Sequence, residues 1–469
     1  MDETIVALAT PVGIGAIGVI RLSGEHAIDI AQSVFSKKIT DKPSHTIHFG
    51  RITSPPSPLF QGGEGETASG KRIKIETLDE VVLSLFKGPH SYTGEDVVEI
   101  SCHGSHYIQQ KIIELLIRQG ARTAKAGEFT LRAFMNGKLD LAQAEAVADL
   151  ISSDSELSHR MAMDQMRGGF SSKIKDLRQQ LIDFASLIEL ELDFGEEDVE
   201  FADRHHLYAL VAEISKYINT LKESFALGNV LKNGIATVIA GKPNAGKSTV
   251  LNALLNEERA IVSSIAGTTR DTIEEAISIN GVLFRFIDTA GIRQSGDEIE
   301  GMGIEKTFEK LNKADLVIYI FDAQITSQEM LEKEIETLQV AGKPVIPVAN
   351  KTDLCDKQIL RKTFKDFPNV IYISGKQGEI SELLTLLQSK AAELNQSSQT
   401  LVNNSRHYEA LHKSAIALDD VMEGLTTERS TDLIALDIRK ALFHLGEITG
   451  EITSDDLLAN IFSRFCIGK

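Results

Sequence analysis

The chain has 469 residues, too many for one hydrophobic core, so about three domains are expected. Its 67 acidic and 49 basic residues give a net charge of −18, which argues against a surface that binds a phosphate backbone as a whole and leaves that role only to a local basic patch. No apolar run reaches the ~18 residues of a membrane span, and the three scattered cysteines suit a reducing cytosol. These features predict a cytoplasmic protein without stable membrane insertion.

The first 138 residues alternate between strand-like and helix-like segments, which predicts an α+β domain. Strands are expected on either side of a turn within 78–101, and a helix is expected near 106–119. A loop rich in Pro, Gly and Ser covers 53–72. The run at 13–18 matches G-x-G-x-x-G, but a strand-like stretch follows it, so turns between strands explain it better than a dinucleotide site.

Helical periodicity dominates from 139 to about 229 and returns after a polar linker near residue 394. In the first stretch, apolar residues recur every three or four positions and predict a buried helix face: Ile174, Leu177, Leu181, Phe184 and Ile188. The two stretches are expected to form one discontinuous helical domain with a nucleotide domain inserted, because insertion is easy where a domain's termini lie close together. The expected segments are 1–138, 139–229, 230–393 and 394–469.

A phosphate-binding loop follows the apolar strand at 235–240. The sequence GKPNAGKS at 241–248 fits G-x-x-x-x-G-K-[ST] in the required strand–loop–helix context. Its glycines let backbone N–H groups curl around phosphates. Lys247 is expected to reach the β- and γ-phosphates, and Ser248 to bind Mg²⁺. The expected contacts of this segment are Asn244, Ala245, Gly246, Lys247, Ser248 and Thr249.

Two further elements predict the rest of the phosphate and metal site. The stretch GTTRD at 267–271 supplies a threonine for the Mg²⁺ shell, assigned to Thr269. A strand then ends in DTAG at 288–291, where Asp288 holds a Mg²⁺-bound water and Gly291 brings its N–H to the γ-phosphate. The expected nucleotide contacts here are Ser263, Thr268, Thr269, Asp288, Thr289, Ala290 and Gly291.

The base-recognition element is NKTD at 350–353, which follows the apolar strand PVIPVA. The carboxylate of Asp353 accepts hydrogen bonds from guanine N1–H and N2–H₂, which adenine does not offer there, so Asn350, Lys351 and Asp353 select GTP over ATP. Ser374, Gly375 and Lys376 are expected to cover the base. Four elements in this order predict a Ras-like P-loop GTPase domain.

The residue after DTAG is Ile292, where Ras-like enzymes carry the glutamine that orients water. An arginine finger is not evident in the sequence either. A carboxylate within 293–303 is therefore expected to take over the positioning of water.

The motifs GKPNAGKST, IAGTTRD, DTAGIR and NKTD are together similar to those of the TrmE–Era–Der class of GTPases. The flanking segments TIVALATPVGIGAIGVIRLSG, SYTGEDVVEISCHG, GEFTLRAFMNGKLDLAQAEAVADLI and GEITGEITSDDLLANIFSRFCIGK resemble the MnmE (TrmE) family of tRNA-modification GTPases. This resemblance runs from residue 4 to residue 469.

The resemblance implies an enzyme that works in a heterotetramer with a flavin-dependent partner, MnmG. Together they add an aminomethyl or carboxymethylaminomethyl group to C5 of the wobble uridine (position 34) of certain tRNAs. A tetrahydrofolate derivative, 5,10-methylene- or 5-formyl-tetrahydrofolate, supplies the one-carbon unit. The N-terminal domain resembles a tetrahydrofolate-binding domain and is implied to form the homodimer.

The resemblance also implies site residues. The folate contacts fall on Arg21, Glu99, Lys138 and Lys469, and the K⁺ ligands on Asn244, Ser263, Ile265 and Thr268. The catalytic glutamate falls on Glu300, which joins Lys247 and Asp288 in the catalytic set, and Cys466 is a thiol of unsettled role. Two departures are Ser263-Ser264, where Thr-Asp is frequent, and Ser374-Gly375-Lys376, where Ser-Ala-Lys is commoner.

Two other functions remain open. An Era- or Der-like ribosome-assembly GTPase would carry either a KH domain after the GTPase domain or a second P-loop, whereas here a helical segment follows a single P-loop. A regulatory switch without further chemistry is opposed by the long N-terminal domain, but only through the family resemblance.

Overall fold

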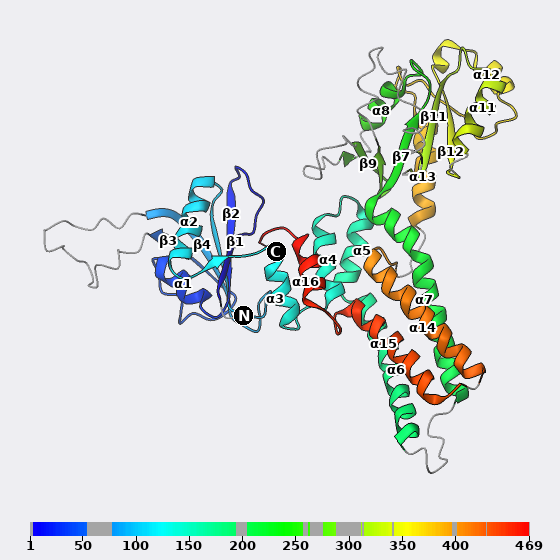
Figure 1. The fold of residues 1–469 in the computed structure, drawn as a ribbon. Coiled ribbons are helices and arrows are strands. Elements are labelled where there is room, and N and C mark those ends of the chain that lie inside the picture. The colour runs from blue at the N-terminus through cyan, green and yellow to red at the C-terminus, as the bar shows by residue number, and fades with distance from the viewer. Residues whose placement is uncertain are drawn as a thin grey trace. The chain divides into compact units, whose positions relative to one another are not determined.

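The computed structural model describes a set of residue ranges: 3–53, 77–193, 204–256, 261–262, 275–287, 311, 314–339, 342–395, 401–427 and 429–468. Contacts divide the chain into two compact units, residues 1–148 with 446–469, and residues 149–445 (Figure 1). Within the described ranges, no helix combines the length and the apolar character needed to cross a membrane. The predicted loop at 53–72 lies, except for Thr53, outside the described residues.

The first unit is built on a six-stranded sheet in the order β3-β4-β5-β2-β1-β6. Neighbouring strands are antiparallel except for the parallel pair β1 and β6. The strands are β1 (Ile5–Leu8), β2 (Ile17–Ser23), β3 (Thr46–Thr53), β4 (Thr77–Phe86), β5 (Val97–His103) and β6 (Arg122–Thr123). The expected strands within 78–101 are confirmed, and the glycine-rich run at 13–18 leads into β2, as turns between strands require.

Helices cover one face of this sheet. Alternate strand residues such as Ile20, Leu83 and Ile100 join the apolar faces of α1 (Ala27–Val34) and α2 (His106–Arg118) in one core. The helix expected near 106–119 is therefore confirmed. Some of the exposed apolar side chains of the described residues lie on strands of the same sheet: Ile17, Ile47, Phe49 and Val82.

The last residues of the described chain complete the first unit. Helix α16 (Asp455–Ser463) packs through Phe462 against α3 (Glu128–Met135) and α4 (Leu141–Ile151). Beyond it, Ile467 pairs with Ala126 as an isolated β-bridge. The sequence placed 446–469 with the helical segment, and contacts group it with residues 1–148, because its apolar residues pack on helices α3 and α4.

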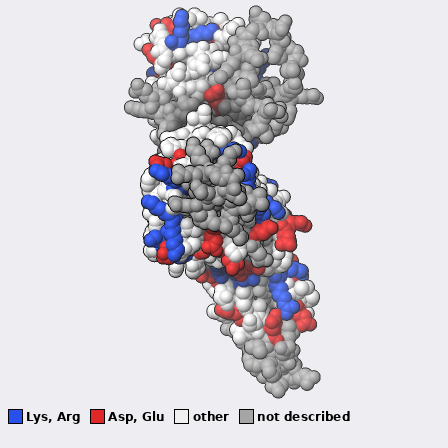
Figure 2. Space-filling view, turned by 90° about the vertical axis from the view of Figure 1, so that its left-hand side faces the viewer, with Lys and Arg blue, Asp and Glu red and all other residues white. Residues whose placement is uncertain are grey.

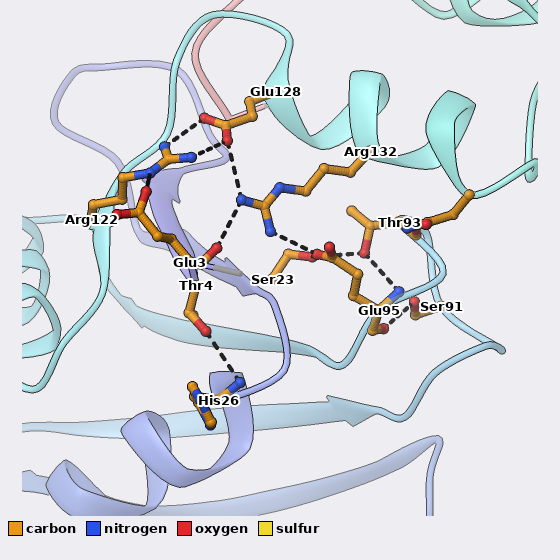
Figure 3. A network of polar contacts seen from close by, with 11 residues as sticks. Glu3, Thr4, Ser23, His26, Ser91, Thr93, Glu95, Arg122, Glu128 and Arg132 are labelled. Carbon is orange, nitrogen blue, oxygen red and sulfur yellow. Dashed lines mark hydrogen bonds and ion pairs between the residues drawn. The ribbon is translucent and has the colours of Figure 1, made fainter. Parts of the chain in front are cut away.

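A buried arginine connects the separate pieces of the first unit (Figure 3). Arg132 on α3 is fully buried and donates to Glu95, to Glu128 and to the backbone carbonyl of Glu3 at 2.9, 3.1 and 2.8 Å. Arg122 of β6 also donates to Glu128. Burial alone would raise the pKa of the Glu128 carboxyl, but hydrogen bonds from the two arginines and a backbone amide outweigh it and lower that pKa to about 2.

The second unit contains a seven-stranded sheet in the order β13-β12-β11-β7-β10-β9-β8. The strands from β13 to β10 run parallel, and β9 is antiparallel to both β10 and β8. The strands are β7 (Ile235–Ala240), β8 (Ile261–Val262), β9 (Glu275–Ile279), β10 (Val282–Phe286), β11 (Leu316–Asp322), β12 (Val345–Asn350) and β13 (Ile371–Tyr372). The shorter helical elements are α8 (Lys247–Leu255), α11 (Gln328–Gln339), η1 (Thr352–Leu354), α12 (Lys357–Thr363) and α13 (Ser381–Asn395).

Helices that precede the seven-stranded sheet in the sequence pack against helices that follow it. They are α5 (Glu156–Met166), α6 (Gly169–Asp193), α7 (Arg204–Asn233), α14 (Ser405–Thr426) and α15 (Thr431–Thr449). Helix α14 lies along α7 (Figure 1). Arg439 of α15 forms an ion pair with Glu189 of α6 at 2.6 Å. The five residues of the predicted apolar face are all buried on α6.

Candidate functional site

The phosphate loop lies between the central strand β7 and helix α8. Gly246 precedes the helix at φ 94°, and Asn244 also has a positive φ of 64°. A side chain at Gly246 would collide with the Asn350 amide, so both conformation and space require glycine there. Helix α8 begins directly after this loop, and the free N–H groups at a helix N-terminus are a common binding site for phosphate.

Lys247 bends back over this loop. Its Nζ donates to the carbonyls of Gly241 and Lys242 at 2.9 and 3.0 Å. Burial lowers the pKa of the ammonium group from its ordinary value. The loop therefore holds the cation at the place where phosphate oxygens are expected. Ser248 and Thr249 follow in the first turn of α8.

Asn350, at the end of β12, joins three motifs that are far apart in the sequence. The side chain is buried, and its Nδ2 donates to the Ala245 carbonyl in the phosphate loop at 2.8 Å. Its Oδ1 accepts from the Gly375 amide at 3.0 Å. The structure thus brings together the phosphate loop, NKTD and the Ser-Gly-Lys segment, as predicted. Glycine in place of alanine at 375 preserves this contact, since the amide belongs to the backbone.

Asp353 and Ser374, two of the residues that the sequence assigns to the base, contact each other. The Ser374 hydroxyl donates to Asp353 Oδ1 at 2.7 Å, which fixes the carboxylate. The residues before them are joined as well, since the Thr352 hydroxyl donates to the Ile373 carbonyl at 2.9 Å. Lys376 is exposed beyond this pair. A carboxylate anchored by one hydroxyl retains lone pairs for the two N–H groups of guanine.

The metal and switch residues predicted from the sequence lie outside the described residues: Ser263, Ile265, Thr268, Thr269, Asp288, Thr289, Ala290, Gly291 and Glu300. One of them, Asp288, comes directly after the described residues 275–287. Strand β10 is parallel to β7, and the Ile287 amide donates to the Thr237 carbonyl at 3.0 Å. The carboxyl end of β10, directly before Asp288, therefore points the same way as the strand that carries the phosphate loop.

The folate contacts implied by the resemblance partly converge in the first unit. Arg21 donates through Nε to Glu99 at 2.8 Å, and its Nη1 lies 3.5 Å from the carbonyl of Gly468. Lys138 instead donates to the Pro89 carbonyl at 3.1 Å. Lys469 lies outside the described residues. Cys466 is exposed, and its carbonyl accepts from the Gly127 amide.

Two aromatic residues that the sequence reasoning missed flank Arg21. The guanidinium lies 5.4 Å from the ring centre of Tyr92 and 5.7 Å from that of Phe129. Both aromatic residues stand inside flanking segments quoted above, SYTGE and GEFTLR. Their proximity to Arg21 depends on the tertiary fold, so spacing alone gave no signal for it. Arg21 thus has an ion pair with Glu99 and two aromatic neighbours in this structure.

Two family models match the chain. One, described as the MnmE helical domain, matches residues 141–466, and one described as the GTP-binding protein TrmE N-terminus matches residues 4–138. The chain is 57% identical to the tRNA modification GTPase MnmE of Cytophaga hutchinsonii, over 100% of this chain and 98% of that relative. It is 53% identical to the tRNA modification GTPase MnmE of Flavobacterium johnsoniae, over 100% of this chain and 99% of that relative. It is 48% identical to that of Bacteroides thetaiotaomicron, over 100% of both.

The chain belongs to the MnmE family of tRNA modification GTPases. It is therefore a GTPase, in agreement with the four sequence motifs. Among solved structures, the G domain of the T. maritima FeoB iron transporter is similar over 34% of this chain and 99% of its own, with 25% identity and a TM-score of 0.25.

Selection of guanine by this member of the MnmE family is predicted to depend on Asp353. Asp353→Asn should weaken GTP binding about 100-fold, because hydrogen bonds to a charged group contribute ~1.5–3 kcal/mol. The same variant should favour xanthosine triphosphate, whose O2 accepts a hydrogen bond from the new amide. Equilibrium titration with both nucleotides measures the exchange. Asp366→Asn, a surface carboxylate that pairs with Gln328, is the control; unchanged GTP affinity in Asp353→Asn would contradict the assignment.

Proposed function

We propose that this GTPase acts with a flavin-dependent partner, MnmG, to add an aminomethyl or carboxymethylaminomethyl group to C5 of the wobble uridine of certain tRNAs. A tetrahydrofolate derivative supplies the one-carbon unit. The observation that carries the proposal is similarity to MnmE relatives over the whole chain at up to 57% identity among those compared. The protein is proposed to act in the cytoplasm, in a heterotetramer.

The proposed organisation has a folate-binding and dimerising segment at 1–138, helical segments at 139–229 and 394–469, and a GTPase segment at 230–393. Contacts between α7 and α14 support the pairing of the helical segments across the inserted one. Exposed apolar residues on the N-terminal sheet, among them Phe49 and Ile17, support a homodimer through that sheet, because a second copy would cover them.

In the proposed GTPase site, the chain's own groups bind and orient the phosphates. Lys247 neutralises the β- and γ-phosphates, Ser248 and Thr269 hold Mg²⁺, and Asp288 holds a water bound to it. The Lys247 ammonium already lies against the loop carbonyls, which supports its role. Mg²⁺ supplies further positive charge on the phosphate oxygens when bound.

The K⁺ site is proposed on Asn244, with backbone carbonyls of Ser263, Ile265 and Thr268. Asn244 lies in the phosphate loop with its backbone at φ 64°, and its amide oxygen is a neutral ligand of the kind that suits K⁺. A bound cation supplies the charge that an arginine finger provides in other GTPases. Glu300 is proposed to orient the attacking water.

The folate site is proposed around Arg21 and Glu99, with Lys138 and Lys469. The carbonyl of Gly468 lies 3.5 Å from Arg21 Nη1, which supports a role for the end of the chain in the same place. Tyr92, which is partly exposed beside Arg21, supports the proposal because its ring offers a face to a pterin, whereas Phe129 is fully buried. Cys466 is proposed as a functional thiol near this site, without an assigned role.

The net charge of −18 does not exclude tRNA binding to a local area of the surface. Figure 2 shows acidic and basic side chains mixed on one face, with neither sign covering it. A local basic area, rather than the whole surface, would meet the tRNA backbone. An Era- or Der-like role in ribosome assembly is the alternative, and it requires a different partner.

Copurification separates these functions. The tagged chain, captured from its own cells, should retain a yellow flavoprotein with the spectrum of a bound flavin. The variant Asp366→Asn serves as a matched surface control. Recovery of ribosomal particles without a flavoprotein would favour the ribosome-assembly alternative and contradict the proposal.

Folate binding is predicted to require Arg21. In the full-length protein, Arg21→Ala should lower affinity for 5-formyltetrahydrofolate at least tenfold by calorimetry, because the cation beside the two rings is lost. GTP hydrolysis should persist. Arg51→Ala is the matched control, since Arg51 pairs with Glu80 on the same sheet as Arg21 pairs with Glu99. Wild-type folate binding by Arg21→Ala would remove the residue from the site.

GTP hydrolysis is predicted to depend on K⁺ and on Glu300. Turnover should be at least tenfold faster in K⁺ than in Na⁺ buffer, since K⁺ fits a carbonyl cage better than the smaller ion. Asn244→Ala should abolish the difference, while Asn219→Ala on α7 should retain it. Glu300→Ala should cut turnover and leave nucleotide affinity nearly intact. Equal rates in both salts would refute the cation mechanism, and normal turnover by Glu300→Ala would exclude it as the catalytic residue.

A further inference from the structure

The lysine of the NKTD element forms an ion pair with a carboxylate that belongs to none of the GTPase motifs. Lys351 Nζ lies 2.7 Å from Asp322 Oδ2. Asp322 is the last residue of β11 and stands in register with Asn350 on the neighbouring strand β12. We propose that Asp322 is a positioning residue of the nucleotide site, which holds the Lys351 side chain in the orientation that guanine nucleotides need.

The carboxylate of Asp322 is itself held in place. The residue is only 9% exposed, and its Oδ1 accepts a hydrogen bond from the Gln324 amide at 3.0 Å. Its backbone carbonyl accepts from the amide of Thr326 at 3.2 Å, which closes the turn after β11. A buried carboxylate is costly unless it is paired, so this fixed charge attracts the lysine ammonium strongly.

The backbone around Lys351 is fixed as well, which leaves its side chain as the part still to be oriented. Lys351 has a φ of 63°, in the left-handed region that residues other than glycine seldom adopt. Asn350 before it binds the phosphate loop, and Thr352 after it is hydrogen-bonded to the Ile373 carbonyl. The backbone does not fix the position of the Lys351 ammonium, which is instead held by Asp322.

The ion pair removes a cost that nucleotide binding would otherwise carry. A lysine side chain has many rotamers, and a ligand that fixes them loses affinity. With the ammonium on Asp322, the end of the Lys351 side chain is already held at the carboxyl end of the neighbouring strand β11. Loss of the carboxylate should therefore raise the dissociation rate of the nucleotide, since the nucleotide would then have to order the Lys351 side chain itself.

The inference rests on the proposed assignment of Lys351 to the nucleotide site, and it is tested with the full-length protein and fluorescently labelled GDP. Asp322→Asn keeps the size of the side chain and its contact with the Gln324 amide, and it should raise the dissociation rate about tenfold. Asp315→Asn is the matched control, because Asp315 precedes the opposite end of β11 and accepts from the Ala236 amide. Its dissociation rate should not change.

A double-mutant cycle separates positioning from a general loss of structure. Lys351→Met alone should raise the dissociation rate, and adding Asp322→Asn should then change it less than twofold, because the two residues act as one pair. Multiplying effects, or an unchanged rate in Asp322→Asn, would overturn the inference. An unchanged rate in Lys351→Met would overturn the assignment of Lys351 together with it. Thermal unfolding checks each variant, and Asp322→Ser replaces Asp322→Asn if that variant does not fold.

Discussion

The nucleotide site depends on the hydrogen bonds of the Asn350 side chain, because they join separate motifs into one site. Its amide spans from the phosphate loop, 105 residues earlier, to the segment 25 residues later. The geometry also explains the glycines around it: a side chain at Gly246 would strike the amide, and one at Gly375 would press against Val250. Because hydrogen bonds are directional, a buried amide that forms them at both ends fixes the distance between the two segments and their relative orientation.

Local patterns in the sequence predicted much of this fold. The apolar strands that precede the phosphate loop and NKTD became β7 and β12, and the three-and-four spacing at 174–188 became the buried face of α6. Such signals succeed because periodicity and motif order are properties of neighbouring residues. The pairing of Asp322 with Lys351 gave no such signal, since it arises from the register of two parallel strands.

In the first unit, the sequence predicted even fewer of the contacts between charged residues. The segment that contains Glu128 and Arg132 is helical in character, and nothing in its spacing indicates that two charged residues face inward. They are buried because the charged side chains of Arg122 and Glu95 and the backbone carbonyl of Glu3 meet them there. Arg21 likewise has its aromatic neighbours only in the folded chain. The sequence predicted these residues through family resemblance where it predicted them at all, and their contacts followed only from the structure.

The packing of residues 446–469 on the first unit has a consequence for biosynthesis. Domains usually fold as they leave the ribosome, beginning with the N-terminal one. Here the surface formed by α3 and α4 is made early, but Phe462 and Phe465, which cover it, are translated after almost all the rest of this sequence. Residues 149–445 emerge in between and are free to fold before the first unit is complete. The unit that is begun first is therefore finished last, and its apolar surface stays uncovered throughout most of translation.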